Sequence, residues 1–186
     1  MADRPHARST WIHEALERFE GPLLHYAARL TGDAERARDV VQETFLRLCA
    51  RDSGEVEERL AEWLYTVCRN LALDVRKKER PMTTTSDGHV LDGPTDAAEP
   101  AALAERRDSV RAVLGALAGL PANQQEVLRL KFQHGLSYKE ISGVTELSVS
   151  NVGYLMHVGL KALRMRLGSG IDDAQSTAQS TGGTAR

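Results

Sequence analysis

The chain has 186 residues, of which 41% are hydrophobic and 27% are charged, and this suits a soluble globular protein of one domain or two small ones. No apolar run approaches the roughly 18 residues that a membrane-spanning helix needs, and the N-terminus has no apolar region typical of a secretion signal, so we expect a cytoplasmic protein. Only 5% of the residues are aromatic, and apolar residues recur at intervals of three and four, which predicts an all-α fold.

Charge is distributed unevenly along the chain. The formal net charge of −2 alone argues against nucleic-acid binding. Residues 1–60 hold 9 Lys or Arg against 12 Asp or Glu, and residues 81–105 hold 5 acids and no base. By contrast, residues 69–80 hold 5 bases against 2 acids, and residues 121–167 hold 6 against 3. Two basic segments separated by an acidic one indicate nucleic-acid contacts that the average conceals.

The cysteine and histidine residues predict no metal or redox site. Cys49 and Cys68 lie within helical patterns and lack the paired spacing of such motifs, so we expect reduced, semi-buried thiols. The six histidines are scattered and form no ligand set with them. Because the sequence also lacks an ATP motif and a nucleophile-base set, we expect no catalytic residues, no cofactor and no enzyme.

The N-terminal part of the chain predicts three helices, of which the first runs from about Trp11 to Leu30. Thr10 can cap this helix, and Pro22 should kink or break it. The second helix begins after Asp33, whose carboxylate can cap it, and reaches about residue 50. Four apolar residues lie on its buried face: Ala37, Val41, Phe45 and Leu48.

The third helix begins after residues 51–58 and ends in the basic "RKKER", residues 76–80, which complements the helix dipole. Pro81 ends it. One apolar stripe runs along it: Leu60, Leu64, Val67, Leu71 and Val75.

Two segments predict irregular structure. Residues 81–100 read "PMTTTSDGHVLDGPTDAAEP" and carry almost no periodic apolar residues, so residues 81–105 should form a flexible acidic linker. The segment 168–186 is rich in Ser, Thr, Gly and Gln and should be a disordered tail. The predicted helical domains are therefore residues 10–80 and 106–167.

The second domain opens with two helices. Pro121 suits the first turn of the second of these, which closes at Gly135. The first helix carries an apolar stripe of four residues: Val110, Val113, Leu114 and Leu117.

Two further capped helices follow in close succession. Ser137 and Glu140 have the spacing of a capping box, and they precede a short helix with Ile141 and Val144. After "TELS", Ser148 can cap a longer helix. A short capped helix, a tight turn and a longer capped helix predict a helix-turn-helix, whose second helix enters the major groove of DNA.

The long last helix has two different faces. Its buried stripe should consist of Val149, Val152, Met156, Leu160, Leu163 and Leu167. Its polar face carries side chains suited to base edges or phosphates: Ser150, Asn151, Tyr154, His157 and Lys161. We expect Gly153 to let the helix lie close to the DNA backbone, with packing against the preceding helix as the alternative. For Gly159 we expect that packing role.

Three blocks of the sequence together resemble a known family. They are "DVVQETFLRL" (39–48), "WLYTVCRNLALDVRKKER" (63–80) and "LPANQQEVLRLKFQHGLSYKEISGVTELSVSNVGYLMHVGLKALRMRL" (120–167). In this order they are similar to regions 2 and 4 of the extracytoplasmic-function (ECF) sigma factors of bacteria. The resemblance covers residues from about 15 to 167.

The resemblance implies roles for individual residues in the first domain. The helix that docks on the clamp helices of the polymerase largest subunit would use Asp39, Gln42, Glu43 and Arg47. Residues 51–58 correspond to the loop that captures a flipped base of the −10 element. The path of the melted strand would be lined by Trp63, Asn70, Arg76, Lys77 and Lys78. Taken alone, the acids at 39 and 43 are typical of a solvated face, and Trp63 fits core packing equally well.

In the second domain the resemblance implies that the −35 element is read or clamped by Ser137, Lys139, Ser150, Asn151, Tyr154, His157 and Lys161. The implied partners are the polymerase core, including its β flap, and promoter DNA, with an anti-sigma factor as a further candidate. The acidic linker would approach the RNA exit path, where its charge suits mimicry of RNA, and a soluble spacer is the alternative.

The sequence departs from the family at several positions. Many members have Lys or Arg where this chain has Gly153, Leu155 and Val158, and Gly where it has Glu146. Phosphate clamping by the second domain would then be weaker, or would fall to Lys161, Arg164 and Arg166. A stand-alone helix-turn-helix regulator, which binds as a dimer without polymerase, remains the alternative reading.

Overall fold

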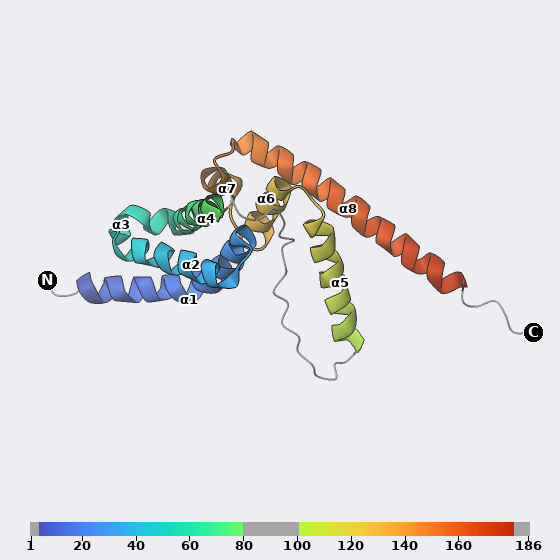
Figure 1. Cartoon of the computed structure of the whole chain (residues 1–186), viewed down its shortest axis with the longest axis horizontal. Coiled ribbons are helices and arrows are strands. Elements are labelled where there is room, and N and C mark those ends of the chain that lie inside the picture. Colours follow the sequence, from blue (N-terminus) through green and yellow to red (C-terminus); the bar gives the residue numbers. More distant parts are fainter. Residues whose placement is uncertain (1–3, 80–100, 181–186) are drawn as a thin grey trace, which may run out of the picture. The chain divides into compact units, whose positions relative to one another are not determined.

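The computed structural model describes residues 4–79 and 101–180, and the regular elements in these ranges are all helical. The all-α prediction is therefore confirmed. In chain order the elements are α1 (Arg4–Thr31), α2 (Ala34–Cys49), α3 (Ser53–Val56), the 3-10 turn η1 (Glu57–Arg59), α4 (Leu60–Glu79), α5 (Ala101–Ala118), α6 (Ala122–Phe132), α7 (Tyr138–Thr145) and α8 (Val149–Ser180) (Figure 1).

The chain divides into two compact units. Unit 1 comprises residues 1–93 together with 139–146, and unit 2 comprises residues 94–138 together with 147–186. The predicted linker lies outside the described residues from 81 to 100, and its last residues, 101–105, belong to α5. Each unit is described by itself.

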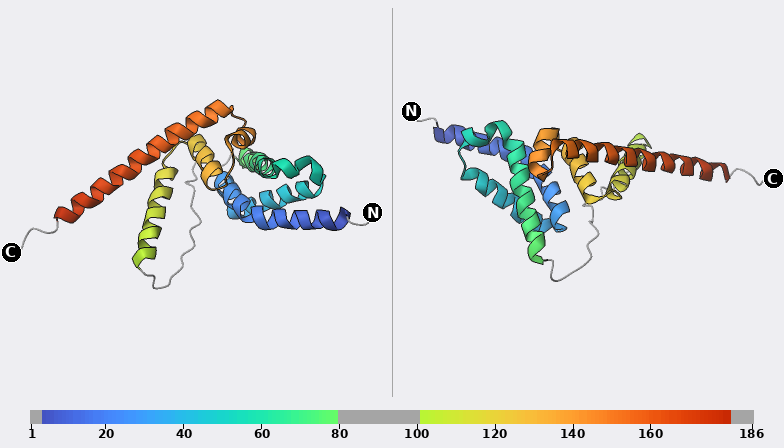
Figure 2. Two further views of the ribbon diagram at one scale, coloured as in Figure 1. Left: turned by 180° about the vertical axis from the view of Figure 1, so that it is seen from behind. Right: turned by 90° about the horizontal axis from the view of Figure 1, so that it is seen from above.

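In unit 1 the helices α1, α2 and α4 pack against one another in all three pairs (Figure 2). Their shared core includes Leu23, Leu48 and Leu64, none of which is accessible to solvent. Two tyrosines close the core with an edge-to-face contact, because the rings of Tyr26 and Tyr65 have centroids 5.3 Å apart and planes at 73°. Burial of these side chains is the main stabilising term for helices of this length.

The first helix differs from its prediction at Thr10, the expected cap, and at Pro22, the expected kink or break. It begins at Arg4, so Thr10 lies inside it and is not its cap, since Pro5 already suits a first turn. Pro22 lies within the helix without ending it. Proline removes one backbone donor, but the burial of Leu23 and Ala27 on the next turn holds the chain in helical form.

The second helix agrees with its prediction. The Asp33 carboxylate accepts a hydrogen bond from the Arg36 backbone N–H at 2.9 Å, which caps the N-terminus. All four residues expected on the buried face are buried: Ala37, Val41, Phe45 and Leu48.

On α4 the buried line is displaced from the predicted stripe. The buried hydrophobic residues are Leu64, Tyr65, Cys68 and Ala72, whereas Leu60, Val67, Leu71 and Val75 are half-buried. The helix meets α1 and α2 together, so its buried face includes the small and the polar-tipped side chains that fit between two helices. A prediction from hydrophobicity alone favours the aliphatic residues for the buried face, because it does not include how each side chain fits between two helices.

In unit 2 the helix α8 packs against α6 and α5. Val127, Leu130 and Val152 are inaccessible to solvent and form the centre of this core. The predicted stripe on α5 is wrong at Val110 and Val113, which are 54% and 44% exposed. The reason is visible in Figure 1: α5 meets the other helices near Ala118, where Leu117 is buried, and diverges from α8 towards its own N-terminus.

The last helix also differs from its prediction at both ends. Ser148 caps it as expected, because its hydroxyl accepts a hydrogen bond from the Asn151 N–H at 3.2 Å. The sequence predicts Val149 in the buried stripe, but this first residue of the helix is 47% exposed. The helix continues to Ser180 through most of the segment predicted to be disordered, which contains no proline to end it. Residues 181–186 lie outside the described residues.

The two cysteines should differ sharply in reactivity. Cys49 is exposed, contrary to the semi-buried state expected of it, whereas Cys68 is fully buried and burial raises the pKa of its thiol to about 12. At pH 8 we expect an alkylating reagent to label one thiol per folded chain and two in denaturant, as counted by mass spectrometry. The raised pKa also means that the buried, neutral Cys68 thiol makes its full contribution to the free energy of unfolding below about pH 8.5. This contribution falls as the pH rises towards 12. Cys49→Ser should leave no labelled thiol in the folded chain, and labelling of Cys68 at the rate of an exposed thiol would contradict this account.

Candidate nucleic-acid interface

The connection between α7 and α8 is a turn of three residues. Its first residue, Glu146, has φ +60°, and it is the one non-glycine residue at positive φ in the described part of the chain. This left-handed conformation favours glycine, which explains why Glu146 stood out as a departure from the family pattern. The order of a short helix, a tight turn and a long capped helix is that of the predicted helix-turn-helix.

The predicted reading face of α8 is open to solvent. Its members are all exposed: Ser150, Asn151, Tyr154, His157 and Lys161. Tyr154 is the most prominent of the large side chains, with 65% of its surface accessible. Because Val152, Leu155 and Met156 are buried on the opposite side, the polar residues are presented together in one direction.

The two glycines of α8 have different surroundings. A Cβ atom on Gly159 would lie 2.9 Å from Cδ1 of Leu128, so this glycine permits close packing of α8 on α6, as predicted. A Cβ atom on Gly153 would meet only the ring of Tyr138, at 3.9 Å, which is ordinary contact. Gly153 is therefore not required by packing, and its proposed closeness to DNA remains a prediction.

Tyr138 is a candidate residue that the sequence did not single out. It lies between the predicted residues Ser137 and Lys139, both of which are exposed, and is itself 39% exposed. Its ring lies close to Gly153 and to the ammonium of Lys131, whose Nζ lies 5.8 Å from the ring centroid. In the sequence, the feature that could have indicated Tyr138 is its position next to Ser137, the serine of the predicted capping box.

A second polar surface lies on α2, opposite the residues that this helix buries. Asp39, Gln42 and Arg47 are exposed there, and Glu43 is half-buried. Nε of Arg47 donates to Oε1 of Glu43 at 2.8 Å, a pair one helical turn apart. Leu46 lies among them and is 57% exposed, which the sequence analysis did not notice. The signal was an aliphatic residue seven positions after Asp39, on the polar side of an amphipathic helix.

Three of the five candidate residues of α4 lie along one line, and Arg76 points towards the other side of the helix. Trp63, Asn70 and Lys77 follow one another at intervals of seven residues and therefore share a face, opposite Cys68 and Ala72 in the core. Trp63 is half-buried, and the other members of the set are exposed: Asn70, Arg76, Lys77 and Lys78. The half-buried position of Trp63 is compatible both with core packing and with contact to the melted strand.

The segment between α2 and α4 is anchored at its middle and at its exit. Val56 is only 6% exposed. Nε of Arg59 donates to Oε2 of Glu62 at 3.0 Å, and Nη2 of the same guanidinium contacts Oε1. These hydrogen bonds to Glu62 raise the pKa of Arg59, whose side chain stays charged throughout.

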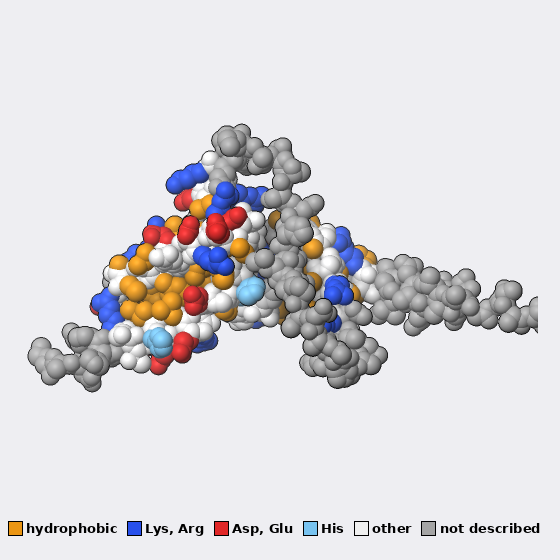
Figure 3. All heavy atoms as spheres, turned by 60° about the horizontal axis from the view of Figure 1, so that its bottom comes forward, with side chains coloured by type: hydrophobic (Ala, Val, Ile, Leu, Met, Phe, Trp, Pro, Cys, Tyr) orange, Lys and Arg blue, Asp and Glu red, His pale blue; other side chains and the backbone are white. Residues whose placement is uncertain are grey.

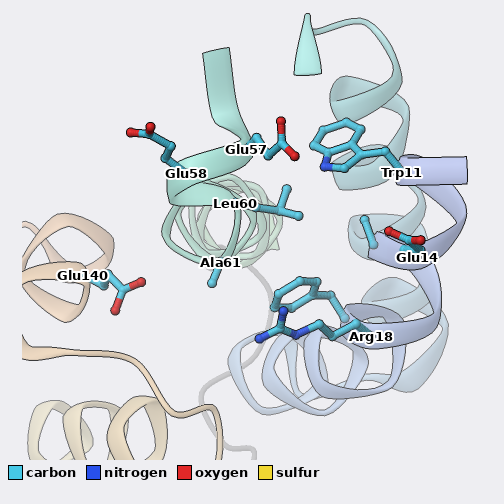
Figure 4. Close-up of a pocket in the computed structure, with 10 residues that line it drawn as sticks. Trp11, Glu14, Arg18, Glu57, Glu58, Leu60, Ala61 and Glu140 are labelled. Carbon is cyan, nitrogen blue, oxygen red and sulfur yellow. The ribbon is translucent and has the colours of Figure 1, made fainter. Parts of the chain in front are cut away.

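Beside this segment lies a shallow pocket of about 340 Å³ (Figure 4). Its floor is formed by apolar residues of α1 and α4, and its rim is charged. The main lining residues are Trp11, Ala15, Phe19, Leu60 and Ala61, with Glu14, Arg18, Glu57 and Glu58 around them. On the face shown in Figure 3, hydrophobic side chains gather near the N-terminal end of α1 with charged groups at their border.

Among the described residues there is neither a candidate membrane-spanning helix nor a candidate metal site. No helix in the ranges 4–79 and 101–180 is long and apolar enough to cross a bilayer. Within the same ranges, no group of three or more His, Cys, Asp or Glu side chains is placed to hold a metal ion.

Two family descriptions match the chain. Residues 15–81 match Sigma-70 region 2, and residues 111–163 match Sigma-70, region 4. The first match covers α2 and α4, and the second covers α6, α7 and the reading face of α8.

Several curated proteins are similar to the chain over most of its length. The ECF RNA polymerase sigma factor SigL of Mycobacterium tuberculosis is 31% identical over 147 residues, which are 78% of this chain and 82% of that protein. SigM of Bacillus subtilis, also an ECF sigma factor, is 26% identical over 163 residues, covering 87% and 98% of the two chains. EcfG of Rhodopseudomonas palustris is 34% identical over 132 residues, 70% of each chain.

Two solved structures share the fold. CnrH, solved in complex with the cytosolic domain of CnrY, gives a TM-score of 0.55 at 20% identity and covers 85% of this chain and 88% of its own. The sigma factor RpoE of Bartonella quintana, solved with the anti-sigma factor NepR, gives 0.59 at 19% identity, with coverage of 84% and 96%.

Proposed function

The chain belongs to the ECF sigma factors and directs transcription initiation by RNA polymerase, and on this premise we propose that residues 10–80 bind core polymerase and capture −10 DNA while residues 106–167 read the −35 element. The observation that carries the proposal is the exposed hydrogen-bonding face of α8, which follows directly after the Glu146 turn. Such a face can pair with base edges in the major groove.

Core polymerase would bind to the polar surface of α2. Asp39, Gln42, Glu43 and Arg47 offer charged and amide groups around Leu46, which provides an exposed apolar centre. An apolar side chain ringed by polar groups is the usual arrangement of a binding hot spot. The Glu43–Arg47 pair would fix the orientation of both side chains before binding.

Melted −10 DNA would lie along α4. Trp63 can stack with a base, Asn70 can hydrogen-bond to one, and Arg76, Lys77 and Lys78 can neutralise phosphates. The contacts of Trp63 and Asn70 with bases are possible only with a strand whose bases are unpaired, whereas the phosphate contacts form with duplex DNA as well. Melting then follows as a shift of population towards the open strand, without ATP, which agrees with a family of initiation factors that are not enzymes.

Two further partners follow from the same premise. The exposed Val110 and Val113 of α5 form an unpartnered apolar face that could receive the β flap of polymerase. Because CnrH and RpoE were both solved with a second protein, an anti-sigma factor is the other partner that we propose for this chain.

Replacing Leu46 by aspartate should weaken binding to core polymerase about tenfold. The side chain is 57% exposed, so the substitution removes the apolar centre of the α2 surface while leaving the fold intact. The affinity is measured by titrating labelled protein with core enzyme. Val149→Asp makes the same chemical change at a 47% exposed site on α8 and should leave core affinity unchanged. Equal affinities for the Leu46 variant and the original chain would remove α2 from the interface.

The rival function, a stand-alone helix-turn-helix regulator, makes a different prediction. Such a protein would shift promoter DNA by itself, as a dimer on a palindrome. The proposed function requires that a specific shift and run-off transcription appear only when core polymerase is added. A specific shift by the protein alone, unchanged by core enzyme, would favour the rival.

A further inference from the structure

Arg8 of α1 reaches across unit 1 to the end of α2. Its Nη2 donates one hydrogen bond to the carbonyl oxygen of Cys49 at 2.6 Å and another to that of Arg51 at 2.8 Å. These contacts join residues that are 41 and 43 positions apart in sequence. Arg8 precedes residue 15, where the match to Sigma-70 region 2 begins, so this contact lies outside the matched segment.

The two carbonyls that Arg8 binds stand at a structural boundary. Cys49 is the last residue of α2, and the final carbonyls of a helix have no partner within it. They also carry the negative end of the helix dipole, which a guanidinium complements in both charge and geometry. Arg51 is the first residue of the segment that corresponds to the base-capturing loop. One side chain therefore fixes both the end of the helix and the beginning of the segment.

The segment is thus held at three points. Arg8 binds its entry, the buried Val56 anchors its middle, and the Arg59–Glu62 pair closes its exit. Between the first two points Gly54 is exposed, and a Cβ atom placed on it would have no neighbour within 4 Å. This part of the segment is the single helical turn α3, and a short turn held at both sides with open space beside its glycine is suited to accepting an inserted group.

We propose that Arg8 is a positioning residue for capture of the −10 base: it holds the entry of residues 51–58 so that the open part of this segment keeps one shape. The inference rests on the proposed function of this segment. Arg8 itself does not contact DNA in this scheme. Its two hydrogen bonds to carbonyl oxygens occupy the guanidinium nitrogen that faces the segment.

The test compares three variants of the full chain. Arg8→Ala removes both hydrogen bonds, and Arg8→Lys keeps the charge on a shorter side chain without the planar guanidinium. His13→Ala is the matched control, because it truncates an exposed side chain of α1 whose ion pair, with Glu17 at 3.3 Å, stays within the same helix.

The first measurement is hydrogen exchange of the free protein, which needs neither polymerase nor DNA. Arg8→Ala should speed exchange of the amides in residues 50–56 about fivefold or more, with no change in the rest of α2. Arg8→Lys should lie between Arg8→Ala and the original chain, and His13→Ala should match the original chain. Unchanged exchange in Arg8→Ala would overturn the positioning role, whatever the function of the segment.

The second measurement uses holoenzyme with single-stranded −10 oligonucleotides that differ in the captured base. Arg8→Ala should lower the ratio of affinities for the preferred and the other bases about fivefold, while −35 duplex binding and core affinity stay constant. The salt dependence of binding should not change, whereas loss of a phosphate contact would reduce its slope by about one. Full rescue by Arg8→Lys or an unchanged ratio in Arg8→Ala would overturn the inference. If the original holoenzyme itself showed no base preference, the proposed function of the segment would fail.

Discussion

Tyr154→Ala is expected to lower transcription from a −35-dependent promoter about tenfold while leaving affinity for core polymerase unchanged. Tyr154 is 65% exposed on the reading face of α8, so its truncation removes a stacking surface and a hydroxyl without opening a cavity in unit 2. A base contact of this kind is worth about 1–3 kcal/mol, and the effect should appear in DNA affinity rather than in folding.

The measurement is run-off transcription with reconstituted holoenzyme on a promoter that needs its −35 element and on one that does not. Tyr154→Phe separates the roles of the ring and the hydroxyl group. Met165→Ala is a control on the same helix, because Met165 is 61% exposed and lies four residues beyond Lys161, the last residue of the reading face. Normal transcription by Tyr154→Ala from the −35-dependent promoter would show that another face of α8 reads the DNA.

The parts of the fold that the sequence predicted well are those decided by local chemistry. The cap at Asp33 and the face from Ala37 to Leu48 depend on neighbouring residues and on helical spacing, and both appear in the structure. The errors occur where tertiary packing decides. Pro22 predicts a break in any isolated helix, yet the buried Leu23 and Ala27 keep α1 continuous.

The stripe on α5 illustrates a second kind of error. Val110 and Val113 have the spacing of a buried face, but burial also requires a neighbour, and α8 diverges from α5 at this point. An apolar stripe therefore predicts that a surface will be covered, not that it is covered within the same chain. For a protein that works on a large assembly, this difference supports the proposal that a partner covers the exposed stripe.

The candidate site shows the same division. The polar face of α8 follows from helical spacing, and all its predicted members are exposed. The residues that were missed are Leu46, Tyr138 and Arg8. Leu46 and Tyr138 had a local signal in the sequence, but it is their exposure in the structure that makes them candidates. The contacts of Arg8 join positions more than forty residues apart, which no local pattern reports.

Gly159→Leu is expected to destabilise unit 2 by about 2 kcal/mol and to lower its unfolding midpoint by about 10 °C. The Cβ atom alone would come within 2.9 Å of Cδ1 of Leu128, which is itself only 2% exposed and has little room to move. This loss of packing energy exceeds the gain of about 1 kcal/mol in helix propensity that comes from replacing a glycine within a helix. Gly159→Ala should be close to neutral, since the end of the Leu128 side chain can shift by a few tenths of an ångström.

The two units can be followed separately in this experiment, because both tryptophans, Trp11 and Trp63, lie in unit 1. Tryptophan fluorescence should therefore show an unchanged transition while circular dichroism shows the early loss of unit 2. Gly168→Leu is the control on the same helix, since a Cβ atom there would meet nothing within 4 Å. If both variants unfold at the same temperature, the α6–α8 contact does not hold the reading helix. If the prediction holds, the variant should keep core affinity and lose −35 recognition when warmed, because the reading face depends on a buried glycine on the opposite side of its helix.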